Sequence, residues 1–109
     1  WVLQRPDSSV RIALNEAFLR RGLPAPEPAI ETSTYNQSLA LVGDSALFTV
    51  APRRAASMHA RLGAVKIVDL DSPIGAMQVG FIHRHSSRDD AAVILFRDCL
   101  QEVVGEAAG

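Results

Sequence analysis

Short apolar segments typical of strands alternate along this chain with longer, one-sided apolar segments typical of helices. The predicted order is strand, helix, strand, helix, strand, helix, strand, strand, helix. Two parallel strands need a crossover connection of about a dozen or more residues, and a helix usually provides it. The alternation therefore predicts an α/β fold with a mixed, mostly parallel sheet flanked by helices.

The segments predicted as strands differ in the spacing of their apolar residues. Residues 46–50 form a nearly continuous apolar run, which suits a strand covered on both faces. Residues 65–70 alternate between apolar and polar, which suits a half-buried strand. The remaining predicted strands cover residues 1–3, 29–32 and 76–82.

The predicted helices are marked by start and stop signals. Gly22 and Pro24 end the first helix, and Pro52 suits the first residue of the third. The last helix is expected to open with a capping box over residues 86–90, and its apolar stripe places Cys99 in a core. We therefore expect helices from a cap among residues 7–9 to Gly22, over residues 35–42, from Pro52 to about Gly63, and over residues 86–104.

The chain has 109 residues, which corresponds to a single domain. Apolar residues make up 48% and charged residues 21%, as in soluble globular domains rather than disordered chains. With 11 Lys and Arg against 12 Asp and Glu, the net charge of −1 argues against a surface for nucleic acid or an anionic membrane. The single cysteine excludes an internal disulfide, and no apolar run approaches the ~20 residues of a membrane span. We expect a cytoplasmic protein and, because the chain begins with Trp1 rather than Met, a piece of a longer one.

A pair of hydroxyls, Ser8 and Ser9, stands at the expected start of the first helix. Free backbone N–H groups and the positive end of the helix dipole can hold a carboxylate or a sugar oxygen there. The alternative is that one of these serines only caps the helix. Arg11, one turn inside, either reaches an anion or lies along the surface.

A second hydroxyl cluster, Thr32, Ser33 and Thr34, follows at the end of a predicted strand. Hydroxyls both donate and accept hydrogen bonds, so they suit reversible binding of a polar ligand. The alternative is that Ser33 or Thr34 caps the next helix. Leu47 and Phe48 are candidates for an apolar wall of the same site, with a place in the core as the alternative.

No combination of residues in the sequence matches a catalytic or metal-binding pattern. His83 and His85 can point the same way on a strand, but zinc takes three or four protein ligands and no third one has a fixed spacing to them. Asp89 and Asp90 suit the first turn of the last helix, where carboxylates complement the dipole. No glycine-rich phosphate loop is present. We expect no catalytic residue, no metal and no cofactor.

In order and spacing, these segments resemble the effector-binding domain of LysR-type transcriptional regulators. The match begins with the strand ahead of residues 8–11. Residues 44–47, Asp-Ser-Ala-Leu, resemble the branch of galactose-binding-protein regulators, and serine and leucine stand where most family members have a Gly-x-Gly pair. The other matching segments are residues 21–24, 30–33, 41–52, 79–84 and 86–104.

The resemblance implies a type II periplasmic-binding-protein-like fold, of which residues 1–75 form the second effector-binding subdomain. Residues 76–104 are then the strand and helix that return to the first subdomain, and residues 105–109 are a tail. A small carboxylate or sugar-like effector would bind between the two subdomains. The ligand-binding residues implied in this chain are Ser8, Ser9, Thr32, Ser33, Thr34, Leu47 and Phe48.

Effector binding in such a regulator changes the arrangement of a homodimer or tetramer, while an N-terminal domain outside this chain holds the DNA. We expect no contact of the chain itself with DNA or with a membrane. Two other classes share this architecture. A solute-binding domain of a transport system needs a signal sequence, and an enzyme domain needs acids or bases in its cleft, for which Asp7, Asp44 and Asp71 are the candidates.

Overall fold

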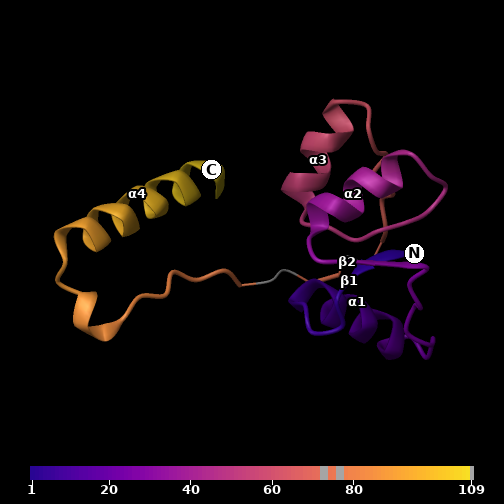
Figure 1. The fold of residues 1–109 in the computed structure, drawn as a ribbon, viewed down its shortest axis with the longest axis horizontal. Helices are drawn as coiled ribbons and strands as arrows, with labels where there is room; N and C mark the ends of the chain where they lie inside the picture. The colour runs from indigo at the N-terminus through magenta and orange to yellow at the C-terminus, as the bar shows by residue number, and fades with distance from the viewer. Residues whose placement is uncertain (72–73, 76–77, 109) are drawn as a thin grey trace. The chain divides into compact units, whose positions relative to one another are not determined.

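The computed structural model describes residues 1–71, 74–75 and 78–108. The chain divides into two compact units, Trp1–Met77 and Gln78–Gly109, which are described here one at a time (Figure 1). The α/β class predicted from the sequence is confirmed for the first unit, which contains a parallel sheet and helices.

The first unit is built around a sheet of two parallel strands, β1 (Val2–Gln4) and β2 (Ile30–Thr32). Their register pairs Val2 with Ile30 and Gln4 with Thr32, so both strands end at the same edge. The crossover between them contains α1 (Ser9–Arg20), and β2 leads into α2 (Tyr35–Gly43) and then α3 (Arg53–Arg61). Helix α1 covers one face of the sheet, and α2 lies on the other (Figure 1).

The core of this unit lies between the sheet and its two helices. Val2 and Leu3 of β1 are fully buried, with Leu14 of α1 and Leu39 of α2 packed nearby at 3% exposure each. Successive residues of a strand point to opposite faces. Glu31 therefore points toward α1 and pairs with Arg11, while the side chain of Thr32 bonds Ser38 on α2.

Glycines end α1 and α3 as the sequence predicts. Gly22 and Gly63 have φ angles of 72° and 74°, in the left-handed region that a side chain disfavours. After Gly22, the N–H of Leu23 donates to the carbonyl of Phe18 at 3.1 Å, which closes the last turn of α1. The predicted second helix is also confirmed, and it is one residue longer than expected.

Three predicted strands are not found among the described residues. Residues 46–50 form no strand, although the carbonyl of Phe48 accepts a hydrogen bond from the N–H of Val2 at 2.8 Å. Residues 65–70 keep the expected alternation of half-buried Val65 and Ile67 with exposed neighbours, but they also form no strand. The strand expected over 76–82 lies partly outside the described residues, and 78–82 form none. A strand exists only when a neighbour completes its ladder of hydrogen bonds, and one bond to β1 does not make a ladder.

The second unit consists of an extended segment, a short turn η1 (His85–Ser87) and α4 (Ala91–Ala108). The predicted helix exists, but the expected capping box over residues 86–90 is wrong, because His85–Ser87 form a separate 3₁₀ turn. Asp90 caps α4 instead, and its carboxylate accepts from the N–H of Ala92 at 2.8 Å. The helix continues past Gly105 into the segment expected as a tail. Cys99 is exposed, so its predicted place in a core is wrong for this unit.

Candidate functional site

The candidate site lies at the edge of the sheet where β1 and β2 end. Gln4 and Thr32 are register partners, so the two strand ends lie side by side. Each strand then leads directly into a helix, and the first turns of α1 and α2 follow this edge. In parallel sheets, ligands bind beyond the carboxyl ends of the strands, where loops meet helix N-termini.

Ser8 and Ser9 differ in their hydrogen bonding at the start of α1. Ser8 is the N-cap, and its hydroxyl accepts a hydrogen bond from the N–H of Arg11 at 3.2 Å. Ser9 is the first residue of the helix and is exposed, and its hydroxyl has no hydrogen bond to any residue that the structure describes. The capping alternative therefore describes Ser8, while Ser9 offers a free hydroxyl.

In the second hydroxyl cluster, Thr32, Ser33 and Thr34, one residue also caps a helix while another has an exposed hydroxyl. Thr34 is the N-cap of α2 in a complete capping box, accepting from the N–H of Gln37 at 3.3 Å while the Gln37 side chain accepts from the N–H of Thr34. Ser33 is exposed, and within the described part of the chain its hydroxyl has no partner. Thr32, by contrast, is buried.

The hydroxyl of Thr32 belongs to a closed internal network. Its oxygen lies 2.7 Å from the Ser38 hydroxyl, and both oxygens lie within 3.4 Å of the carbonyl oxygen of Thr34. Two hydroxyls carry two protons. One proton joins the two hydroxyls and the other goes to the Thr34 carbonyl, so Thr32 and Ser38 have only lone pairs left for a ligand.

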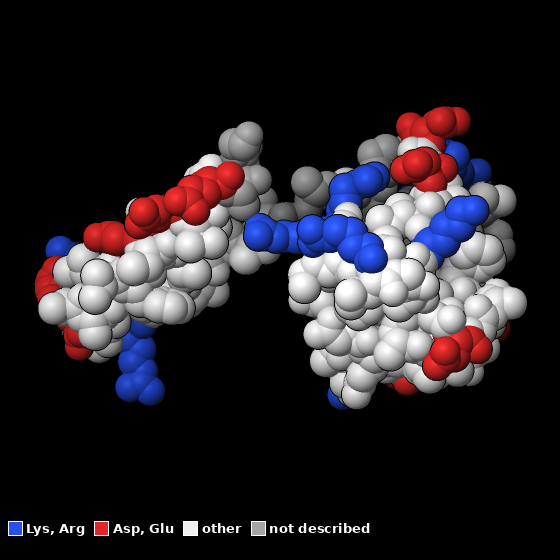
Figure 2. Space-filling model, turned by 90° about the horizontal axis from the view of Figure 1, so that it is seen from above, with Lys and Arg blue, Asp and Glu red and all other residues white. Residues whose placement is uncertain are grey.

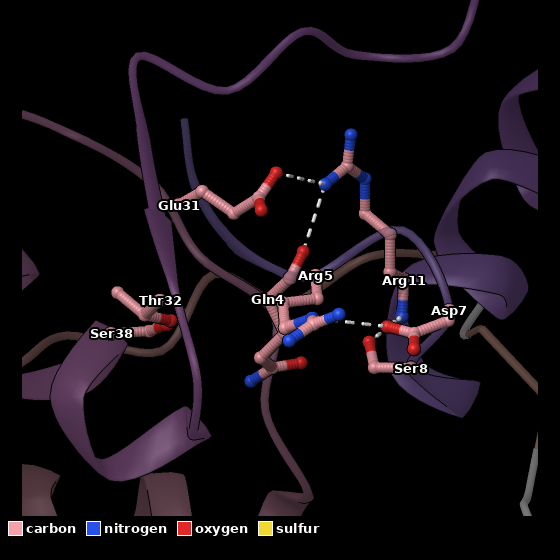
Figure 3. A network of polar contacts seen from close by, with 8 residues as sticks. All are labelled: Gln4, Arg5, Asp7, Ser8, Arg11, Glu31, Thr32 and Ser38. Carbon is pink, nitrogen blue, oxygen red and sulfur yellow. Dashed lines mark hydrogen bonds and ion pairs between the residues drawn. The ribbon is translucent and has the colours of Figure 1, made fainter.

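One of the two alternatives placed Arg11 along the surface. The structure instead places its side chain between the start of α1 and the sheet (Figure 3). Only 8% of the residue is exposed, and Nη1 donates to the carbonyl oxygen of Gln4 at 2.8 Å. The same nitrogen lies 3.9 Å from the carboxylate of Glu31, whose side chain is 49% exposed. Arg11 therefore ties the first turn of α1 to the ends of both strands.

Gln4 is the residue that sequence reasoning missed. It is 5% exposed, and its Nε2 is buried without a hydrogen-bond partner among the described residues, as is Nε of Arg11. The Gln4 amide points away from the Arg11 guanidinium and, by register, shares the α2 face of the sheet with Thr32 (Figure 3). The available signal was a polar residue placed last in an apolar strand, directly before a turn.

Leu47 and Phe48 are not brought to this edge. The Phe48 ring packs against Trp1, with ring centroids 6.0 Å apart, and Trp1 also packs against Phe18 near the end of α1. This aromatic group therefore lies at the start of β1, opposite the hydroxyls. Leu47 is half-buried next to it in the chain.

An open pocket of about 520 Å³ lies beside β2 and α2. Its lining includes Thr32, Ser33 and Gln37 together with the apolar Leu41. The exposed hydroxyl of Ser33 and the capping box of α2 thus border a hollow on the surface, whereas Gln4 does not line it.

The described residues hold no group of three or more His, Cys, Asp or Glu arranged to bind a metal ion. The Nδ1 atom of His83 lies 2.9 Å from the carbonyl oxygen of Arg84, and Nδ1 of His59 lies 3.0 Å from that of Ala55. None of the helices in the described ranges is long and apolar enough to cross a membrane.

Comparison with known proteins assigns the chain to a family. The model of the LysR substrate binding domain matches residues 1–105. The HTH-type transcriptional regulator GalR of Pseudomonas putida is 25% identical over 108 residues, which are 99% of this chain and 27% of that regulator. The chain thus spans about a quarter of the curated relative that it matches. No solved structure matches the chain. The resemblance noted from the sequence is confirmed, and the chain belongs to the LysR substrate-binding domain family.

Proposed function

We propose that residues 1–75 form one wall of the effector-binding cleft of a LysR-type transcriptional regulator. One observation carries this proposal. The carboxyl ends of β1 and β2 lie side by side, and the chain continues from each of them into the N-terminus of a helix, α1 or α2. The first subdomain, outside this chain, would supply the other wall. Residues 76–104 would lead back to that subdomain.

The groups with free hydrogen-bonding capacity define the class of effector. Ser9 and Ser33 offer hydroxyls, and Thr32, which lines the pocket, offers only lone pairs. Helix N-termini favour negative charge, because their backbone N–H groups are unpaired. This combination suits a small ligand with a carboxylate or several hydroxyls, such as an organic acid or a sugar acid. Leu47 and Phe48 are not part of the proposed site.

The proposed function is sensing rather than catalysis. The effector would shift the balance between arrangements of a cytoplasmic homodimer or tetramer, and an N-terminal domain of the parent protein would bind DNA. Membership of a substrate-binding family and similarity to a protein named as an HTH-type transcriptional regulator support this reading.

The test is thermal unfolding of the 109-residue chain, and of the parent regulator, with a panel of organic acids, aromatic acids and sugars. A ligand present at about 100 times its Kd stabilises the folded state by about 2.7 kcal/mol. For a unit of this size, each kcal/mol raises Tm by roughly 4–8 °C. A binding compound should therefore raise Tm by roughly 11–22 °C.

Variants locate the site. We expect Ser9→Ala and Ser33→Ala to reduce the ligand-induced rise while leaving the Tm without ligand unchanged, because both hydroxyls lack partners in the described structure. Ser57→Ala on α3 is the matched control. A ligand whose effect survives both site variants binds elsewhere, and if no compound shifts the parent regulator the proposed sensing role is wrong.

A further inference from the structure

The side chain of Gln37 occupies backbone N–H groups between the end of β2 and the start of α2. Its Oε1 atom accepts from the N–H of Ser33 at 3.1 Å and from the N–H of Thr34 at 3.3 Å. In a capping box, this side chain bonds the N–H of the N-cap residue, and here it also bonds the N–H of the residue before the cap. One carboxamide oxygen therefore takes the position between two neighbouring donors that an anion oxygen can take at a helix start.

Helix α1 has no equivalent contact. Its N-cap is Ser8, and the residue at the position that matches Gln37 is Arg11, whose guanidinium only donates hydrogen bonds. The N–H of Ser8 instead donates to the carbonyl oxygen of Arg5 at 3.0 Å. At this edge of the sheet, a movable side chain thus stands in for an acceptor at the start of α2 and not at the start of α1.

The Gln37 side chain can leave these N–H groups without disturbing the core. The residue is exposed, and it lines the open pocket together with Thr32 and Ser33. The hydroxyl of Thr34 accepts from the backbone N–H of Gln37 at 3.3 Å. Because that bond uses the backbone of Gln37, it continues to cap α2 when the Gln37 side chain turns into solvent.

We propose that the Gln37 side chain is a displaceable substitute for a carboxylate oxygen of the effector and sets the affinity of the proposed site for acids. The lining of the pocket contains no Lys or Arg, so backbone N–H groups are the positive groups that it offers to a carboxylate. Hydrogen bonds to an ionised acceptor are roughly twice as strong as bonds to a neutral one, so a bound acid can replace the carboxamide. The apparent Kd then equals the intrinsic Kd divided by the fraction of molecules in which Gln37 has left the two N–H groups.

This inference rests on the proposed function, because it concerns the strand end that is assigned there to the effector. A purely structural role for Gln37 predicts the opposite result. If Gln37 only caps α2, its removal destabilises the helix and leaves binding unchanged or weaker. If Gln37 competes with the ligand, its removal strengthens binding even though the cap is weaker.

The test is a titration of the isotope-labelled 109-residue chain with sodium lactate, followed by the amide NMR signals of Ser33 and Thr34. Sodium chloride at equal ionic strength is the reference. We expect Gln37→Ala to bind lactate about three- to tenfold more tightly than the wild type, which is the factor by which one neutral hydrogen bond closes the site. We expect Gln37→Glu to bind at least about tenfold more weakly, because a carboxylate then holds both N–H groups and repels the probe.

Asn36→Ala is the matched control, because it removes an exposed amide one position earlier in α2 that has no side-chain hydrogen bond to any described residue. We expect it to leave lactate binding unchanged. The amides of α4 in the second unit are an internal reference. Asp98, Glu102 and Glu106 lie along one side of that helix and repel an anionic probe (Figure 2).

The proposal is wrong if Gln37→Ala binds lactate no more tightly than the wild type, or if Asn36→Ala tightens binding as much. It is also wrong if lactate moves neither the Ser33 nor the Thr34 amide signal in any variant. The effector proposal is tested separately, by the panel of compounds with the parent regulator, so the two failures are distinguishable.

Discussion

Replacing Arg11 by alanine tests whether the contacts at the end of the sheet hold the first unit together. The side chain is buried, donates to the Gln4 carbonyl at 2.8 Å and lies 3.9 Å from the Glu31 carboxylate. Arg11→Ala removes these contacts and leaves the carbonyl of a buried strand residue without that donor. It also removes the aliphatic stem that packs between α1 and the sheet.

The size of the effect follows from the contacts. A hydrogen bond from a charged donor contributes about 1.5–3 kcal/mol. The pair with Glu31 adds at most ~1 kcal/mol, because that carboxylate is half exposed and screened by solvent. Removal of Nε, which is buried without a partner, returns about 1 kcal/mol. We therefore expect Arg11→Ala to lower the free energy of unfolding by about 2 kcal/mol, which corresponds to roughly 8–16 °C in Tm.

The assay is urea unfolding followed by the fluorescence of Trp1, the single tryptophan, which packs against Phe18 and Phe48 in the same unit. Arg20→Ala is the control, because Arg20 forms only an exposed i,i+4 pair with Glu16, worth roughly 0.3–0.5 kcal/mol. If Arg11→Ala destabilises no more than Arg20→Ala, Arg11 does not hold the strand ends. If Arg11→Met matches the wild type, the stem matters and the guanidinium does not.

Three further substitutions test single features of the first unit, and a fourth tests α4 of the second unit. Gly43→Ala should destabilise by about 1–3 kcal/mol in chemical unfolding, because a Cβ there would lie 2.8 Å from the backbone oxygen of Ala64, and an unchanged midpoint would contradict this packing. Thr34→Ala should cost about 1 kcal/mol by loss of the α2 cap, and retained stability would mean that water replaces the hydroxyl. Gly22→Ala should cost roughly 1 kcal/mol because its φ is 72°, whereas Gly105→Ala, within α4 and free of contacts, should increase helicity in circular dichroism.

The helices could be predicted from the sequence because their signals are local. The positive φ of Gly22, the capping residue Thr34 and the glycine stop after α3 each act over one turn of chain. The strands depend on neighbours that can be far away in the sequence. Residues 46–50 have a strand pattern but only one backbone hydrogen bond to β1, and residues 65–70 alternate without a ladder. Periodicity predicts which face of a segment avoids water, and it does not supply the partner that makes the segment a strand.

The same distinction applies to the candidate site. The sequence identifies Ser8 and Thr34 as either caps or ligand groups, and the structure shows that both cap helices. Neither the burial of Arg11 nor its bond to Gln4 has a local signal, because the contact joins a helix to a strand end. Gln4 directly follows the strand predicted over residues 1–3, and its burial was not predicted.

The same hydroxyls can cap a helix or bind a ligand. The protons and lone pairs that remain after the internal hydrogen bonds are made determine which ligand groups the proposed site can bind. A hydroxyl that accepts from a backbone N–H, as in Ser8 and Thr34, still carries its own proton and can donate it outward. The protons of Thr32 and Ser38 are both used internally, so that buried pair can only accept. The edge therefore offers donors at both helix starts and an acceptor between them. A ligand that only accepts, such as a simple carboxylate, would leave the Thr32 lone pairs unused. In the proposed site a hydroxy acid would satisfy both kinds of group, and for that reason hydroxy acids and sugar acids belong first in the binding panel.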